Sequence, residues 1–125
     1  MPQLIVARST PTLVEYFGRN AIRDPAEVER FYDRCSDLMR ELLDGLAELP
    51  DTPRPFPAIE DAIGWPRRRI ASVLGGVFRL RHREFDGRRP YHFQDTRQSA
   101  SGRWEMWMDS GQAAAVRRAH GPDVR

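Results

Sequence analysis

The side chains best suited to chemistry in this sequence are arginines in the stretch 66–80. An arginine guanidinium donates paired hydrogen bonds to phosphate oxygens and to guanine edges. At 100° per residue, one face of a helix here combines basic residues with small ones: Arg68, Ser72, Gly75 and Arg79. Small residues let a helix approach a surface closely, so this face predicts contact with a polyanion. The adjacent Arg67 and Arg69 complete a triplet at the start of the same helix.

Residues that bind metals or perform catalysis are scattered along the chain. The three histidines and the single cysteine form no close ligand pair: His82, His92, His120 and Cys35. A zinc site is therefore not expected. Three acidic residues could hold magnesium in a nuclease, but no nuclease motif accompanies them: Glu84, Asp86 and Glu105. Because phosphate-binding glycine loops and nucleophile elbows are also missing, we expect no enzyme activity, no cofactor and no metal.

The distribution of charge favours an anionic partner for the C-terminal half. Residues 1–62 contain 12 acidic and 7 basic residues, whereas residues 63–125 contain 6 acidic and 13 basic residues. All 20 basic residues are arginine, which a GC-rich genome also produces, so their placement is more informative than their number. No apolar run approaches the roughly 20 residues of a membrane span, and no signal segment opens the chain. We therefore expect a cytoplasmic protein.

The N-terminal half is expected to be helical after an arm or short strand over residues 1–23. Asp24 and Pro25 supply a capping acid and a proline at the first helical position. Apolar residues at helical spacing then predict one helix over 25–48, with this buried face: Val28, Phe31, Tyr32, Cys35, Leu38, Met39, Leu42 and Leu46. On that face, Cys35 is expected to be a buried structural thiol.

Two helices joined by a tight turn are predicted next. After a proline-rich linker, a short helix begins at Pro57 and turns three residues inward: Ile59, Ala62 and Ile63. Gly64 lies in the turn, where a left-handed backbone is needed, and Trp65 is expected to pack beneath it. The second helix runs from 66 to about 82 over a buried stripe: Ile70, Val73, Leu74 and Val77. An alternative remains open, in which Gly75 and Gly76 end this helix and residues 77–85 continue as a strand.

A β-hairpin and a last helix complete the predicted domain, which spans residues 24–120. Tyr91 to Phe93 form a short strand, and a polar loop leads to residues 103–108, which alternate. The alternation predicts three residues in the core: Trp104, Met106 and Met108. Glu105 and Trp107 would then face outward, where Trp107 would mark a surface for a protein partner. A helix capped by Asp109 ends near His120, and residues 121–125 are expected to form a flexible tail.

The stretch AIEDAIGWPRRRIASVLGGV, with the order helix, short helix, turn, basic helix, hairpin and helix, resembles a winged helix-turn-helix domain of MarR-like and ArsR-like bacterial regulators. The resemblance covers about Phe31 to His120. The chain is also similar to small uncharacterised winged-helix proteins of GC-rich bacteria, through its GW-P-R and W-M-D stretches. For the regulators, the resemblance implies a recognition helix (about 66–82) in the major groove and a wing (about 88–108) along the backbone. By position, it implies these DNA-binding residues: Arg67, Arg68, Arg69, Ser72 and Arg79 on the helix, and Arg88, Arg89 and Arg97 on the wing.

We therefore expect a mainly helical α+β protein that binds duplex DNA and regulates transcription. A 14.5 kDa unit has a small footprint, so specificity would require a homodimer or a partner protein. The alternative is a non-catalytic adaptor that binds a protein through the hairpin near Trp107. The positive end of the helix dipole disfavours three exposed arginines by a few tenths of a kcal/mol each. A bound phosphate would remove that penalty, which favours the DNA hypothesis.

Overall fold

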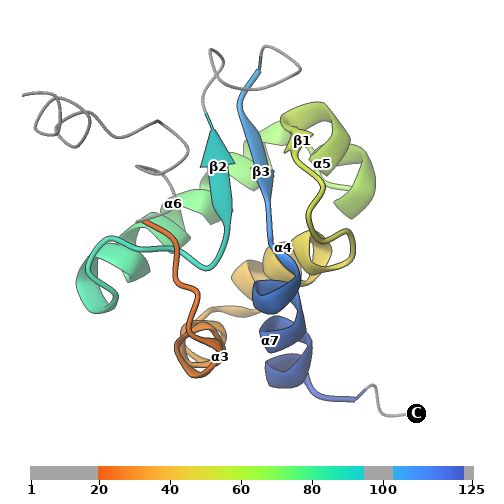
Figure 1. Cartoon of the computed structure of the whole chain (residues 1–125). Coiled ribbons are helices and arrows are strands. Elements are labelled where there is room, and N and C mark those ends of the chain that lie inside the picture. The colour runs from red at the N-terminus through yellow and green to blue at the C-terminus, as the bar shows by residue number, and fades with distance from the viewer. Residues whose placement is uncertain (1–19, 95–102, 123–125) are drawn as a thin grey trace, which may run out of the picture.

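The computed structural model describes residues 20–94 and 103–122 of the chain (Figure 1). Most of the predicted N-terminal arm, the middle of the hairpin loop with Arg97, and residues 123–125 of the predicted tail lie outside the described residues. Within the described ranges the chain forms five helices and a small antiparallel sheet of three strands. None of these helices has both the length and the apolar character needed to cross a bilayer.

The single helix predicted over 25–48 is wrong, because the chain forms two helices there. The first is α3 (Pro25–Asp33), and the second is α4 (Asp37–Ala47). The Ser36 side chain caps α4 by accepting a hydrogen bond from the Met39 amide at 3.3 Å, and an N-cap residue has a non-helical backbone. Leu38, in the first turn of α4, is 45% exposed, although it was predicted in the buried face.

The predicted pair of helices joined by a tight turn is confirmed. The short helix is α5 (Phe56–Ile63), and the basic one is α6 (Arg67–Glu84). Gly64 ends α5 in the left-handed region at φ 82°, as the turn requires. The helix α6 continues through its two glycines, so the alternative strand over 77–85 does not form. Ala62 was predicted to face inward but is exposed.

The sheet contains a strand that the sequence did not predict. Its strands are β1 (Arg54–Pro55), β2 (His92–Gln94) and β3 (Glu105–Trp107), in the order β1-β3-β2. Met106, at the centre of β3, pairs with Arg54 on one side and Phe93 on the other. The hairpin is therefore widened at one edge by two residues of the proline-rich linker.

The positions of three residues in and beside β3 differ from the predicted alternation. Trp104 precedes the strand and is 49% exposed, whereas it was predicted in the core. Glu105 is buried, and Trp107 is half-buried with its ring stacked on His92 at 5.4 Å, although both were predicted to face outward. Because β3 is the central strand, neighbouring strands and side chains cover positions that an isolated hairpin would expose.

The last helix, α7 (Ser110–His120), begins with a capping box between Asp109 and Gln112, so the predicted cap is confirmed. It packs against α3 and α4, and α6 passes behind the hairpin strands (Figure 1). The five helices of the described ranges contribute to one apolar core. Its largest fully buried hydrophobic side chains are Phe31, Phe85, Ile22, Leu42, Leu43, Leu46, Ile59, Ile70 and Met108.

Candidate nucleic-acid interface

The start of α6 is fixed by aromatic rings beneath its arginines. Trp65 is buried under the turn, as predicted, and the Arg69 guanidinium lies 5.8 Å from the centre of its ring. Arg67 lies 5.3 Å from the ring of Phe56 and forms an ion pair with Glu60 at 3.4 Å. Stacking on aromatic rings holds planar guanidinium groups in defined positions without burying them.

The inner face of α6 is anchored by four buried residues: Ile70, Val73, Val77 and Leu80. Leu74, predicted in the same stripe, is only partly buried. A methyl group on Gly76 would lie 3.2 Å from the Met39 sulfur, so this glycine allows α4 to approach α6 closely. Gly76 therefore serves the packing of α6 against α4.

The outer face of α6 carries Arg68, Ser72 and Arg79, all exposed as predicted. The Arg79 guanidinium folds back over the helix, since a methyl group on Gly75 would lie 3.7 Å from Arg79 Nη1. Among residues 20–94 and 103–122, no carboxylate lies within ion-pair distance of Arg68 or Arg79. Their positive charge is therefore uncompensated by the described part of the fold.

An open groove runs beside this face, between α6 and the start of α4. It consists of two adjoining hollows of about 400 and 350 Å³ that share Leu38, Ser72 and Val73. Five arginines line it: Arg34, Arg68, Arg69, Arg79 and Arg83. Sequence reasoning missed Arg34 and Arg83, because Arg34 reaches the groove only through the break between α3 and α4. Both are held by Glu84, at 2.8 Å for Arg34 and 3.3 Å for Arg83.

The arginines assigned to the wing have other surroundings. Arg88 forms two hydrogen bonds to the Glu27 carboxylate, one of 2.9 Å from Nη1 to Oε1 and a second from Nη2 to Oε2. This pairing lowers the pKa of Glu27. The Arg88 guanidinium is therefore paired with Glu27 of α3. Arg88 also lies before β2, the first strand of the hairpin.

Arg89 is 7% exposed and lies against the rings of Phe93 and Tyr91, at 4.0 and 5.8 Å. Burial lowers its pKa to about 10, and within the described residues its Nη1 atom has no hydrogen-bond partner. Its backbone bonds to the segment before α3, since the Ile22 amide donates to the Arg89 carbonyl at 2.7 Å. Arg89 is therefore a buried part of the fold and does not join the exposed arginines of α6.

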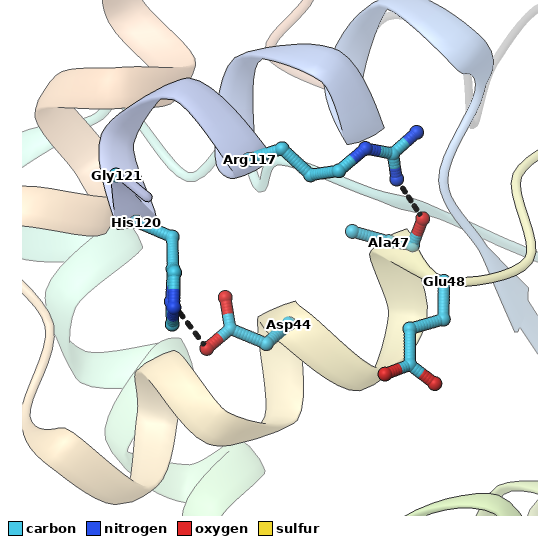
Figure 2. Close-up of a pocket in the computed structure, with 6 residues that line it drawn as sticks. All are labelled: Asp44, Ala47, Glu48, Arg117, His120 and Gly121. Carbon is cyan, nitrogen blue, oxygen red and sulfur yellow. Dashed lines mark hydrogen bonds and ion pairs between the residues drawn. The ribbon is translucent and has the colours of Figure 1, made fainter. Parts of the chain in front are cut away.

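A second polar cluster lies between the ends of α4 and α7, where they border a cleft of about 390 Å³ (Figure 2). The Tyr32 hydroxyl donates to Asp44 at 3.0 Å, and His120 Nδ1 lies 3.1 Å from the same carboxylate. Arg117 donates to the Ala47 carbonyl at 2.6 Å, which satisfies the C-terminal end of α4. These bonds join three helices, and the cluster contains no serine, threonine or cysteine that could act as a nucleophile.

The remaining candidates for chemistry are dispersed in the fold. Each histidine has a different partner: His92 Nε2 lies 3.0 Å from Asp109, the His82 ring contacts Phe78, and His120 lies beside Asp44. Cys35 is buried as predicted, and burial raises the pKa of its thiol to about 12. Across the described ranges, no three histidine, cysteine or acidic side chains converge on a point that could hold a metal ion.

The residues of the sequence hypothesis thus separate into an exposed set on α6 and an internal pair before β2. The fold that presents them is a mainly helical α+β arrangement with a three-stranded antiparallel sheet. No protein-family model, curated protein or solved structure gives a significant match to this chain.

Proposed function

We propose that this protein is a winged helix-turn-helix protein that binds duplex DNA through the outer face of α6 and regulates transcription. The element order supports this architecture, because two helices joined by a tight turn precede a β-hairpin. The strand β1 lies between α4 and α5 and adds an edge to that hairpin. The observation that carries the proposal is the exposure of Arg68, Ser72 and Arg79 without a carboxylate partner among the described residues.

In this proposal Arg68, Ser72 and Arg79 face the edges of the bases. Guanidinium groups recognise guanine, and a serine hydroxyl bonds to either donors or acceptors. Arg67 and Arg69, stacked on their aromatic rings, would contact phosphates beside the helix start. Arg97, from the hairpin loop, remains a predicted backbone contact.

The size of the unit makes self-association part of the proposal. A single recognition helix covers few base pairs, and regulators of this architecture reach useful specificity by placing two such helices on adjacent turns of DNA. We therefore propose that the protein binds DNA as a homodimer. Sedimentation of the free protein and of its DNA complex measures the number of chains in each.

The experiment that tests DNA binding compares two double variants that lose the same charge. Arg68→Ala/Arg79→Ala removes the unpaired arginines of α6, and Arg23→Ala/Arg118→Ala removes two exposed arginines elsewhere. Each lost base contact weakens binding by about 1–3 kcal/mol, so the α6 variant should bind duplex DNA at least about ten-fold more weakly than the control variant. Equal affinity of the two variants would contradict the proposal.

The hairpin supports a second candidate function, in which the protein binds a protein partner. The supporting observation concerns Trp104 and not Trp107: Trp104 is exposed, and its ring stacks on Phe93 at 5.3 Å. Exposed, ordered tryptophans are frequent at the centres of protein interfaces. In this function Trp104→Ala would abolish capture of the partner while Arg68→Ala would not.

A further inference from the structure

The aromatic ring of Phe78 is held in place on α6 although it is 54% exposed. The His82 ring, one turn further along the helix, contacts it with centroids 4.4 Å apart. The Arg81 guanidinium lies 5.3 Å from the centre of the Phe78 ring. An exposed apolar side chain usually moves among rotamers, but the Phe78 ring is restrained by His82 on one side and Arg81 on the other.

The neighbours of Phe78 are themselves fixed by the turn that follows α6. A methyl group on Gly87 would lie 3.2 Å from His82 Cε1, so the imidazole rests against this turn. The Gly87 amide donates to the Arg81 carbonyl at 2.8 Å, and Arg81 Nη1 donates to the Gly87 carbonyl. The Phe78 ring is therefore preorganised, and a partner that binds it does not have to order it first.

Phe78 belongs to the same outer arc of α6 as the exposed arginines. At 100° per residue it lies about 80° around the helix from Arg68 and about 100° from Arg79. The groove lined by arginines lies on the other flank of that arc, near Arg69 and Arg83. The outer face of α6 thus has a basic flank and an aromatic flank.

We infer that Phe78 contacts the C5-methyl group of thymine and makes this protein selective for sites that contain thymine at that position. This inference rests on the proposed DNA-binding function. A phenyl ring donates and accepts no strong hydrogen bond, and the thymine methyl is the apolar group that unmodified base pairs present in the major groove. Arginines on the basic flank would read guanine or phosphate, so the two flanks recognise different chemistry.

The test uses deoxyuridine, which differs from thymidine only by the missing methyl group. Duplexes that bind wild-type protein are selected from a random pool, and each thymine of a selected site is then replaced singly by deoxyuridine. For wild-type protein, at least one replacement should weaken binding by about three- to five-fold, as expected for one buried methyl group. Phe78→Ala should lose no affinity when deoxyuridine replaces thymine at that position. Phe78→Leu and the control Leu49→Ala, which removes another exposed apolar side chain away from the groove, should lose as much affinity as wild-type protein.

Each protein is compared with itself on thymine and deoxyuridine duplexes, so a small change in the stability of a variant affects both affinities equally. Wild-type protein that binds DNA but tolerates deoxyuridine at every position would overturn the role of Phe78 and leave DNA binding intact. The role of Phe78 would also be overturned if Phe78→Ala lost as much affinity on deoxyuridine replacement as wild-type protein does. Wild-type protein that selects no duplex would overturn both the inference and the proposed function.

Discussion

Gly45 lies within α4, where glycine is less favourable than alanine by about 1 kcal/mol. A methyl group at this position would lie 2.7 Å from Cγ1 and 3.0 Å from Cδ1 of Ile63, the last residue of α5. Such distances are too short for carbon atoms, so a side chain at residue 45 would force Ile63 to shift from its position between α4 and α5. Because Gly64 and α6 follow directly, this contact helps to position the exposed arginines.

We predict that Gly45→Ala destabilises the protein in spite of its higher helix propensity. Overpacking destabilises by about 1–3 kcal/mol, and the propensity gain of about 1 kcal/mol offsets part of that. The net loss in the free energy of unfolding is therefore about 0–2 kcal/mol. In an Ile63→Ala background the obstructing atoms are gone, and the same substitution should stabilise by about 1 kcal/mol.

Urea denaturation of the four proteins, followed by circular dichroism, measures this change of sign. The coupling between residues 45 and 63 should equal the overpacking energy, about 1–3 kcal/mol. If Gly45→Ala stabilised both backgrounds by the same amount, the close approach of α4 and α5 would not constrain residue 45, and the reasoning would be refuted.

Three further outcomes are expected. Ser36→Ala removes the α4 cap and should lower the free energy of unfolding by about 1 kcal/mol in urea titrations, whereas Ser36→Asp should not. Burial opposes ionisation of Asp109, but hydrogen bonds from His92 and Gln112 outweigh it and hold its pKa below the ordinary value of 3.8. The ionised carboxylate therefore stabilises the fold above pH 3.8, and this stabilisation is lost as the pH falls through the folded pKa. Asp109→Asn retains a cap, so the free energy of unfolding of this variant should depend less on pH in acid than that of wild-type protein. Finally, Cys35 should react with a thiol reagent at pH 8 only after unfolding, because its folded pKa is about 12; fast reaction of native protein would contradict its burial.

The elements nearest the candidate site were predictable because their signals are local. The turn is signalled by a single residue, Gly64, because glycine readily adopts the left-handed backbone that ends α5. The apolar stripe from Ile70 to Val77 identifies the inner face of α6. Once that inner face is known, the outward positions of Arg68 and Arg79 follow from helix geometry.

The errors arose where distant residues or very short elements decide the structure. The apolar period continues across Ser36, so periodicity concealed a break that the serine cap creates. Two residues are too few for β1 to show a pattern. The environment of Arg88 depends on Glu27, 61 residues away, and no local rule reveals such a pairing.

The salt dependence of duplex DNA binding tests the proposed function most directly. Each phosphate contacted lowers the logarithm of the binding constant by about 0.9 per tenfold rise in salt. Three phosphate contacts, from Arg67, Arg69 and the hairpin loop, predict that a plot of log binding constant against log salt concentration falls with a slope of about −2.7 or steeper. The slope should be shallower for Arg67→Ala/Arg69→Ala. Absence of binding at low salt, or affinity that does not change with salt, would contradict DNA recognition by α6.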